Sequence, residues 1–175
     1  MKSLGAKIVT LEQFKKLRPK LNGKVVMTSG GFDPIHPGHV SLFAAAKSLG
    51  NTLVVVVNGD SFLIAKKGKP FQDLKTRSMI ISGLRNVDYV IPFEIEGDLT
   101  VARALEYIRP HIFANGGDRS SGKRLPEQEV AASKRYNIKF VFRVGMAKKW
   151  SSSWFLSEWT TFVEKNRLGT ILKAE

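Results

Sequence analysis

The chain has 175 residues, a length that suits one domain with a sizeable hydrophobic core. It contains 43% hydrophobic and 25% charged residues, and no apolar run comes near the ~20 residues that span a bilayer. The absence of cysteine excludes disulfides and thiolate metal sites. A cytoplasmic protein without membrane association is therefore expected. The net charge of +13 attracts anions such as nucleotides, phosphorylated metabolites or nucleic acid.

Strands and helices are expected to alternate from the N-terminus. Residues 1–23 are predicted to form a helical lead-in, followed by a short apolar strand over 24–28 and a helix over 38–49. The β-branched run over 52–57 is apolar on both faces, which is typical of a buried parallel strand. The basic segment 61–71 contains glycine and proline, and we expect a mobile loop there.

The second half of the chain continues the alternation. The expected elements are helices over 74–84, 99–108 and 126–136, strands over 89–91, 112–114 and 138–142, and a terminal helix over 151–163 with a tail to residue 175. Five strands alternating with helices predict an α/β fold, a Rossmann-like doubly wound parallel sheet in a single domain over 1–175. Ligands bind such sheets at the carboxyl ends of the strands, where three glycine-containing turns lie in this sequence.

The sequence GGFDPIHPGH, residues 30–39, gives the strongest chemical signal. Its paired glycines let the backbone approach a ligand closely, and a helix that starts near Gly38 offers free N–H groups and a positive dipole end to a phosphate. His36 and His39 flank that helix start, so both imidazoles can point at one anion and donate hydrogen bonds to it.

These histidines have two alternative roles. They could be metal ligands, but only His111 remains as a third histidine and there is no cysteine, which disfavours a zinc site. Either could also be an ordinary, partly buried side chain. The His-Pro-Gly-His run at a strand-to-helix turn favours the phosphate-binding role.

GGFDPIHPGH resembles the HxGH signature of the cytidylyltransferase-like nucleotidyltransferase superfamily. The resemblance continues through residues 24–60, the lysine-rich segment after them and the run TRSMIISGLRNVDYVIPF at 76–93, and it covers about residues 8–155. Within the superfamily the pattern is most similar to the heptose-phosphate adenylyltransferase domain and to glycerol-3-phosphate cytidylyltransferase.

This resemblance implies an enzyme that transfers AMP or CMP from a nucleoside triphosphate to a small phosphorylated acceptor, such as a sugar or polyol phosphate, and releases pyrophosphate. ATP is slightly favoured over CTP. The resemblance also implies Mg²⁺ that is held by the triphosphate rather than by protein side chains, and a homodimer.

Roles for individual residues follow from the same resemblance. His36 and His39 would stabilise the transition state at the α-phosphorus, together with a lysine of the basic segment, Lys66 or Lys67. The nucleotide-binding residues would be Gly30, Gly31, Phe32, Asp33 and Gly38 in the first turn, Gly116, Gly117 and Asp118 after the fourth expected strand, and Ser151, Ser152 and Ser153 at the start of the last helix. The acceptor-binding residues would be Asn58, Asp60, Arg77 and Arg119.

Most of these assignments have an ordinary structural alternative. Asp33 could fasten its turn, and the lysines could lie on a solvated loop. Arg77, for which the resemblance implies a role at the acceptor or at a dimer contact, could be a charge on a helix surface. The glycine pair could form a plain turn, and one of the serines could be a helix N-cap. The chain also departs from the family pattern: Trp150 replaces an isoleucine, and Arg143 or Lys149 would have to replace an arginine that usually lies nearby.

Two competing functions remain at this level. A fragment of a class I aminoacyl-tRNA synthetase would use a similar strand-to-helix geometry, but a KMSKS-type loop is missing. A basic nucleic-acid-binding module would account for the charge, but neither an RNP-like aromatic strand nor a helix-turn-helix pattern supports it.

Overall fold

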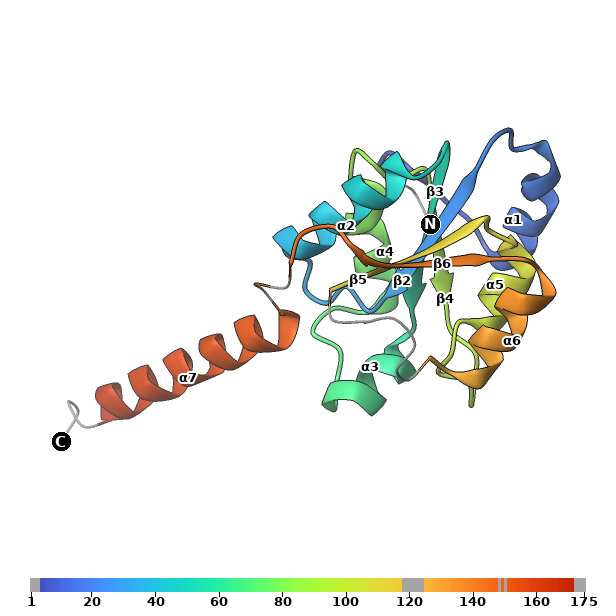
Figure 1. Ribbon diagram of the computed structural model, residues 1–175. Helices are drawn as coiled ribbons and strands as arrows, with labels where there is room; N and C mark the ends of the chain where they lie inside the picture. The colour runs from blue at the N-terminus through green and yellow to red at the C-terminus, as the bar shows by residue number, and fades with distance from the viewer. Residues whose placement is uncertain (1–3, 118–124, 148, 150, 172–175) are drawn as a thin grey trace.

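The computed structural model describes residues 4–117, 125–147, 149 and 151–171, the last five of these by their backbone alone. Within these residues a parallel sheet of six strands has the order β1-β4-β3-β2-β5-β6, with helices on both faces (Figure 1). Its strands are β1 (Lys7–Ile8), β2 (Val25–Gly30), β3 (Thr52–Asn58), β4 (Tyr89–Phe93), β5 (Ile112–Gly116) and β6 (Lys139–Val144). The helices are α1 (Leu11–Leu17), the 3-10 turn η1 (Arg18–Lys20), α2 (Pro37–Ser48), α3 (Asp60–Lys67), α4 (Leu74–Ser82), α5 (Ala102–Ile108), α6 (Glu127–Arg135) and α7 (Ser152–Ile171).

Strand β3 shows why the sheet is covered on both sides. Val55 and Val57 belong to a core that also contains residues of α2 and α4, whereas Val54 and Val56 belong to a second core with residues of α1, α5 and α6. All four valines are fully buried. Because successive side chains of a strand point to opposite faces, a central strand between two helical layers must be apolar throughout. The expected single α/β domain is confirmed.

The strand order reverses beside β2. The chain runs from β2 to β3 and β4 on one side of β2, and it then crosses to β5 and β6 on the other side. At such a point two neighbouring crossovers leave the sheet in opposite directions and open a crevice at the carboxyl ends of the strands. The turns after β2, β3 and β5 therefore meet at one edge of the sheet.

Two expectations differ from the structure. A sixth strand, β1, lies in the predicted helical lead-in and pairs with β4 at the edge of the sheet. The expected mobile loop over 61–71 instead contains α3, whose Leu63 is buried. The carboxylate of Glu94 accepts a hydrogen bond from the Ser61 N–H at the helix start, and Gly68 ends the helix with a positive φ of 89°.

Helix α7 extends away from the rest of the molecule (Figure 1) and continues eight residues past the expected end at residue 163, to Ile171. None of the helices in the described part of the chain is long and apolar enough to cross a membrane.

Candidate active site

A cavity of about 400 Å³ opens at the carboxyl ends of β2, β3 and β5. It brings together most of the residues singled out in the sequence: Gly30, Gly31, Phe32, Asp33, His36, Gly38, His39, Asn58, Lys66, Lys67, Gly116, Gly117, Ser151, Ser152 and Ser153. Asp60 and Arg77 do not line it. Asp118 and Arg119, expected near the nucleotide and the acceptor, lie outside the described residues, as does Trp150.

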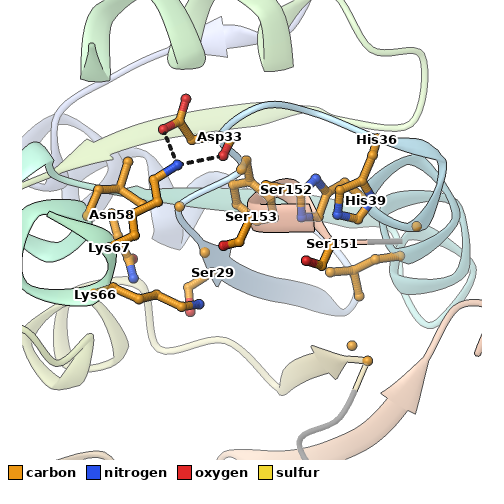
Figure 2. A pocket seen from close by; sticks show the side chains of 18 of the residues that line it. Ser29, Asp33, His36, His39, Asn58, Lys66, Lys67, Ser151, Ser152 and Ser153 are labelled. Carbon is orange, nitrogen blue, oxygen red and sulfur yellow. Dashed lines mark hydrogen bonds and ion pairs between the residues drawn. The ribbon is translucent and has the colours of Figure 1, made fainter. Parts of the chain in front are cut away.

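The two histidines lie side by side at one end of the cavity (Figure 2). Their rings are stacked, with centroids 3.6 Å apart and planes inclined by 21°, and the edge of the Phe32 ring supports His39 at 5.1 Å. His36 is the N-cap residue of α2, and Pro37 begins the helix, where its missing N–H is no loss. Both Nδ1 atoms are buried and have no hydrogen-bond partner among the described residues. Ring packing therefore accounts for much of the placement of the pair, and neither Nδ1 atom is engaged by the described chain.

Burial keeps both imidazoles neutral near pH 7. It lowers the pKa of His39 to about 3, with smaller contributions from the charges of His36 and Lys66. Burial also lowers the pKa of His36, against an opposing backbone hydrogen bond. A neutral imidazole has one N–H to donate and one nitrogen to accept, and an incoming anion would favour its protonated form.

The depressed pKa predicts that the fold loses stability in mild acid. In the unfolded chain His39 takes up a proton near pH 6.5, whereas in the fold it stays neutral until about pH 3. The unfolded state therefore binds more protons in this window, and this residue lowers the unfolding free energy by up to about 1.4 kcal/mol for each pH unit of acidification. Urea unfolding at pH 7 and pH 5 should show a larger loss for the wild type than for His39→Gln. Equal losses would contradict the depressed pKa.

Asp33 fastens the turn after β2 to the segment after α3. Its fully buried carboxylate accepts hydrogen bonds from the backbone N–H groups of Phe71 (2.7 Å) and Gln72 (2.8 Å), and it forms an ion pair with Lys67 at 2.7 Å (Figure 2). The Lys67 ammonium also donates to the Asp33 carbonyl at 2.8 Å. This geometry favours the turn-fastening alternative for Asp33 and occupies Lys67.

Lys66 has a different environment from its neighbour. It extends into the cavity toward Ser29 (Figure 2), and within the described chain its ammonium has neither an ion-pair nor a hydrogen-bond partner. Its charge adds to the lowering of the pKa of His39, after burial and the charge of His36. Of the two lysines proposed from sequence, Lys66 is therefore the one that can meet a phosphate.

Arg77 is a buried connector. Its guanidinium donates to the carbonyls of Gly31 (2.7 Å), Asn58 (2.7 Å) and Gln72 (2.9 Å), and it pairs with Asp60 at 2.5 Å. The acceptor-binding role expected for Arg77 and Asp60 does not fit this placement, and neither does the surface-charge alternative. Arg77 instead holds together the turns that follow β2 and β3.

Asn58 remains a candidate for substrate contact. Its side chain lines the cavity, and the buried Oδ1 has no hydrogen-bond partner in the described part of the protein. A buried amide oxygen without a donor is unfavourable unless a ligand supplies one.

Two glycines of the cavity wall have a structural reason. At Gly38 a Cβ would lie only 3.0 Å from the His36 ring, and Gly117 has a positive φ of 62°.

The three serines at the start of α7 have separate roles. Ser151 caps the helix, because its hydroxyl accepts from the Trp154 N–H at 3.1 Å. Ser152 donates to the Pro34 carbonyl at 2.8 Å and so ties α7 to the turn after β2. Ser153 faces the cavity, together with Lys149, one of the two cations proposed to replace the missing arginine. The capping alternative therefore accounts for only one of the three.

Sequence reasoning assigned no role to several residues of the cavity wall: Ser29, Leu42, Phe62, Leu63, Asn115 and Met146. The apolar ones have no chemical group that marks a site in the sequence, so they carried no signal. Ser29 could have been found, because it precedes the paired glycines at the end of β2.

The site contains cations and helix N-termini that can bind an anion, but few side chains that could bind a metal. The described residues contain no group of three or more His, Cys, Asp or Glu side chains that could hold an ion. His111, the third histidine, accepts a hydrogen bond from the Val25 N–H at the opposite end of β2. The arrangement suits a polyphosphate that enters between the N-termini of α2 and α7.

The sequence is similar to those of known proteins over most of its length. The chain is 40% identical over 125 residues to the bifunctional protein HldE of Haemophilus ducreyi, and the matched region covers 70% of this chain and 26% of that protein. The HldE of Aliarcobacter butzleri is 37% identical over 139 residues, or 77% and 28% of the two chains. The chain thus spans about a quarter of the length of these relatives.

Two solved structures share the fold. One is the lipopolysaccharide core biosynthesis protein from Thermoplasma volcanium, with 29% identity, a TM-score of 0.58 and coverage of 71% of this chain and 99% of that one. The other is pantoate-beta-alanine ligase from Francisella tularensis, with 18% identity, a TM-score of 0.55 and coverage of 84% and 69%, a likeness of fold alone. A model of the cytidylyltransferase-like family matches residues 27–141, from β2 to β6, and includes both histidines. The chain therefore belongs to the cytidylyltransferase-like family of nucleotidyltransferases.

Proposed function

We propose that this protein transfers a nucleoside monophosphate, with AMP preferred over CMP, from a nucleoside triphosphate to a phosphorylated sugar or polyol and releases pyrophosphate. The observation that carries this proposal is the stacked pair His36 and His39, which share one cavity with the N-termini of α2 and α7 and with Lys66.

The proposed reaction needs no nucleophilic side chain. A phosphate oxygen of the acceptor attacks the α-phosphorus in line, a new P–O bond forms, and the bond to the leaving pyrophosphate breaks. His36 and His39 donate hydrogen bonds to the α-phosphoryl oxygens as negative charge builds on them. Lys66 offsets the repulsion between the two anionic substrates.

Mg²⁺ fits this proposal as an ion bound by the triphosphate and water, where it would neutralise charge on the phosphate oxygens. In the described part of the chain, Asp33 at the cavity is paired with Lys67, and Asp60 is paired with Arg77. Protein carboxylates are therefore not proposed as ligands.

The acceptor is proposed to be a sugar phosphate on two grounds. Identity of up to 40% to HldE proteins and 29% to a lipopolysaccharide core biosynthesis protein supports a substrate of carbohydrate chemistry. In the cavity, the free Oδ1 of Asn58 can accept a hydrogen bond from a sugar hydroxyl.

A screen of ATP and CTP against a panel of sugar and polyol phosphates, with Mg²⁺ present, tests the proposal through pyrophosphate release. Release with one nucleotide and one acceptor class supports it. Pyrophosphate release only with an amino acid would point to a synthetase-like activity. Salt-sensitive binding of nucleic acid without turnover would replace the proposal by a binding function.

Lys66→Ala and Lys67→Ala should separate catalysis from stability. Lys66→Ala is expected to lower turnover about 10- to 100-fold with little change in the unfolding free energy, because within the described chain its exposed ammonium meets only the face of the Phe62 ring, 5.7 Å away. Lys67→Ala leaves the buried Asp33 carboxylate without its cation and should lower the unfolding free energy by about 3 kcal/mol. Urea unfolding and pyrophosphate release measure the two effects. The opposite pattern would exchange the roles of the two lysines.

A further inference from the structure

Helix α7 carries a row of large apolar side chains that face solvent. Phe155 is 37% exposed, Trp159 64% and Phe162 55%, and the half-buried Leu156 and Val163 lie beside them. The helix extends away from the body of the protein (Figure 1), and in the described structure only its first turn meets another element: the ring of Phe155 lies 6.4 Å from that of His36, centroid to centroid. A helix gains most of its stability in water from packing an apolar face, and Trp159 and Phe162 remain more than half exposed within one chain.

The spacing of the row is that of a helix–helix interface. At about 100° per residue, the five side chains fall within an arc of roughly 120°, as in a short heptad pattern with Phe155, Trp159 and Phe162 at the central positions. Glu158 and Lys165 lie one heptad apart on one border of the arc. Ser157 and Glu164 occupy the opposite face.

We propose that α7 pairs in antiparallel orientation with α7 of a second copy of this chain. A two-fold axis between Trp159 and Phe162 brings each of these rings opposite the other on the second copy. The same symmetry places Glu158 opposite Lys165, and it does so twice.

The residues on the two borders of the row favour the antiparallel arrangement over a parallel one. In the antiparallel register Leu156 meets Val163 of the second copy, so one border of the interface is apolar and the other is charge-complementary. A parallel pair would instead set the carboxylate of Glu158 beside Val163 and leave Lys165 without an acidic partner at the matching position. The occupant that fits the row is therefore a second α7.

The first test measures the mass of the full-length protein by sedimentation equilibrium at about 0.15 M salt, where the repulsion between two chains of net charge +13 is screened. The wild type should form a dimer in a concentration-dependent manner. Trp159→Glu should raise the dissociation constant by at least about 30-fold, as for a central aromatic residue of an interface. Ser157→Glu adds the same side chain on the opposite face and should leave the dissociation constant unchanged.

The second test uses charge reversal, which leaves the apolar row intact. Glu158→Lys and Lys165→Glu should each weaken self-association about tenfold, because each replaces two attractions by two repulsions. An equimolar mixture of the two variants should form a heterodimer with an affinity near that of the wild type, since both pairs are then opposite in sign. Glu164→Lys, the same charge change on the opposite face, is the matched control.

A monomeric wild type at all concentrations, or a dimer that Trp159→Glu does not weaken, would overturn the proposal. Failure of the mixture to restore affinity would overturn the antiparallel register. Binding of a monomer to anionic lipid vesicles that is lost in Trp159→Glu would assign the row to a membrane surface instead and would equally overturn it. These readouts are independent of nucleotidyl transfer.

Discussion

His36→Ala and His39→Ala are each expected to lower turnover by about two to three powers of ten and to leave the fold intact, a loss typical of removing one donor to a transition-state oxyanion. The two rings stack on each other, and both Nδ1 atoms lack a partner within the described residues, so alanine breaks no internal hydrogen bond of these atoms. Pyrophosphate release under single-turnover conditions measures the effect, and urea unfolding confirms the fold. Near-normal turnover of either variant would remove that histidine from the proposed mechanism.

His111→Ala is the control for this experiment. Its Nδ1 accepts a hydrogen bond from the Val25 N–H at the far end of β2, so its loss should reduce stability and spare turnover. The double variant of His36 and His39 adds a further check. Because both rings are proposed to act on one phosphate, its loss should be much smaller than the product of the two single losses.

The histidine pair could be found from sequence because its geometry is local. Pro37 and Gly38 fix the start of α2 within three residues, and Gly38 leaves the space beside the His36 ring that a Cβ would fill. The parallel sheet was predictable for a related reason. A run that is apolar on both faces, such as β3, has few stable places other than the centre of a sheet between helices.

Helix α3 could not be predicted, because distant residues hold it. The local composition, with Gly68 and a proline soon after it, indicates a loop. The cap at Ser61 comes from Glu94, 33 residues further along the chain, and the burial of Leu63 depends on the finished cavity wall. Tertiary contacts of this kind override local propensity and leave no periodic pattern in the sequence.

The sequence could not separate Lys66 from Lys67 for the same reason, because a distant residue decides their roles. The two lysines are adjacent and identical in type, and only the position of Asp33, 34 residues earlier, decides which of them is held in an ion pair. The sequence could name both candidates, but the fold was needed to separate them.

Arg77→Met is expected to lower the unfolding free energy by about 3–5 kcal/mol, the largest stability effect of any variant considered. The guanidinium is fully buried, and its loss leaves the carbonyls of Gly31, Asn58 and Gln72 without their donor and Asp60 without its ion pair. Arg85→Met, at an exposed side chain, should change stability by less than about 0.5 kcal/mol. Urea unfolding of both variants at pH 7 measures the difference.

Arg77→Lys distinguishes the connector from a simple buried charge. A lysine keeps the charge and can pair with Asp60, but its single ammonium cannot reach the carbonyls of Gly31 and Asn58 while it does so. We therefore expect it to recover only part of the lost stability. Because those two carbonyls belong to the turns after β2 and β3, the folded fraction should also show a raised KM, as the walls of the cavity are no longer held at a fixed separation. Full recovery by lysine would mean that charge alone, and not the forked geometry of arginine, holds the two turns together.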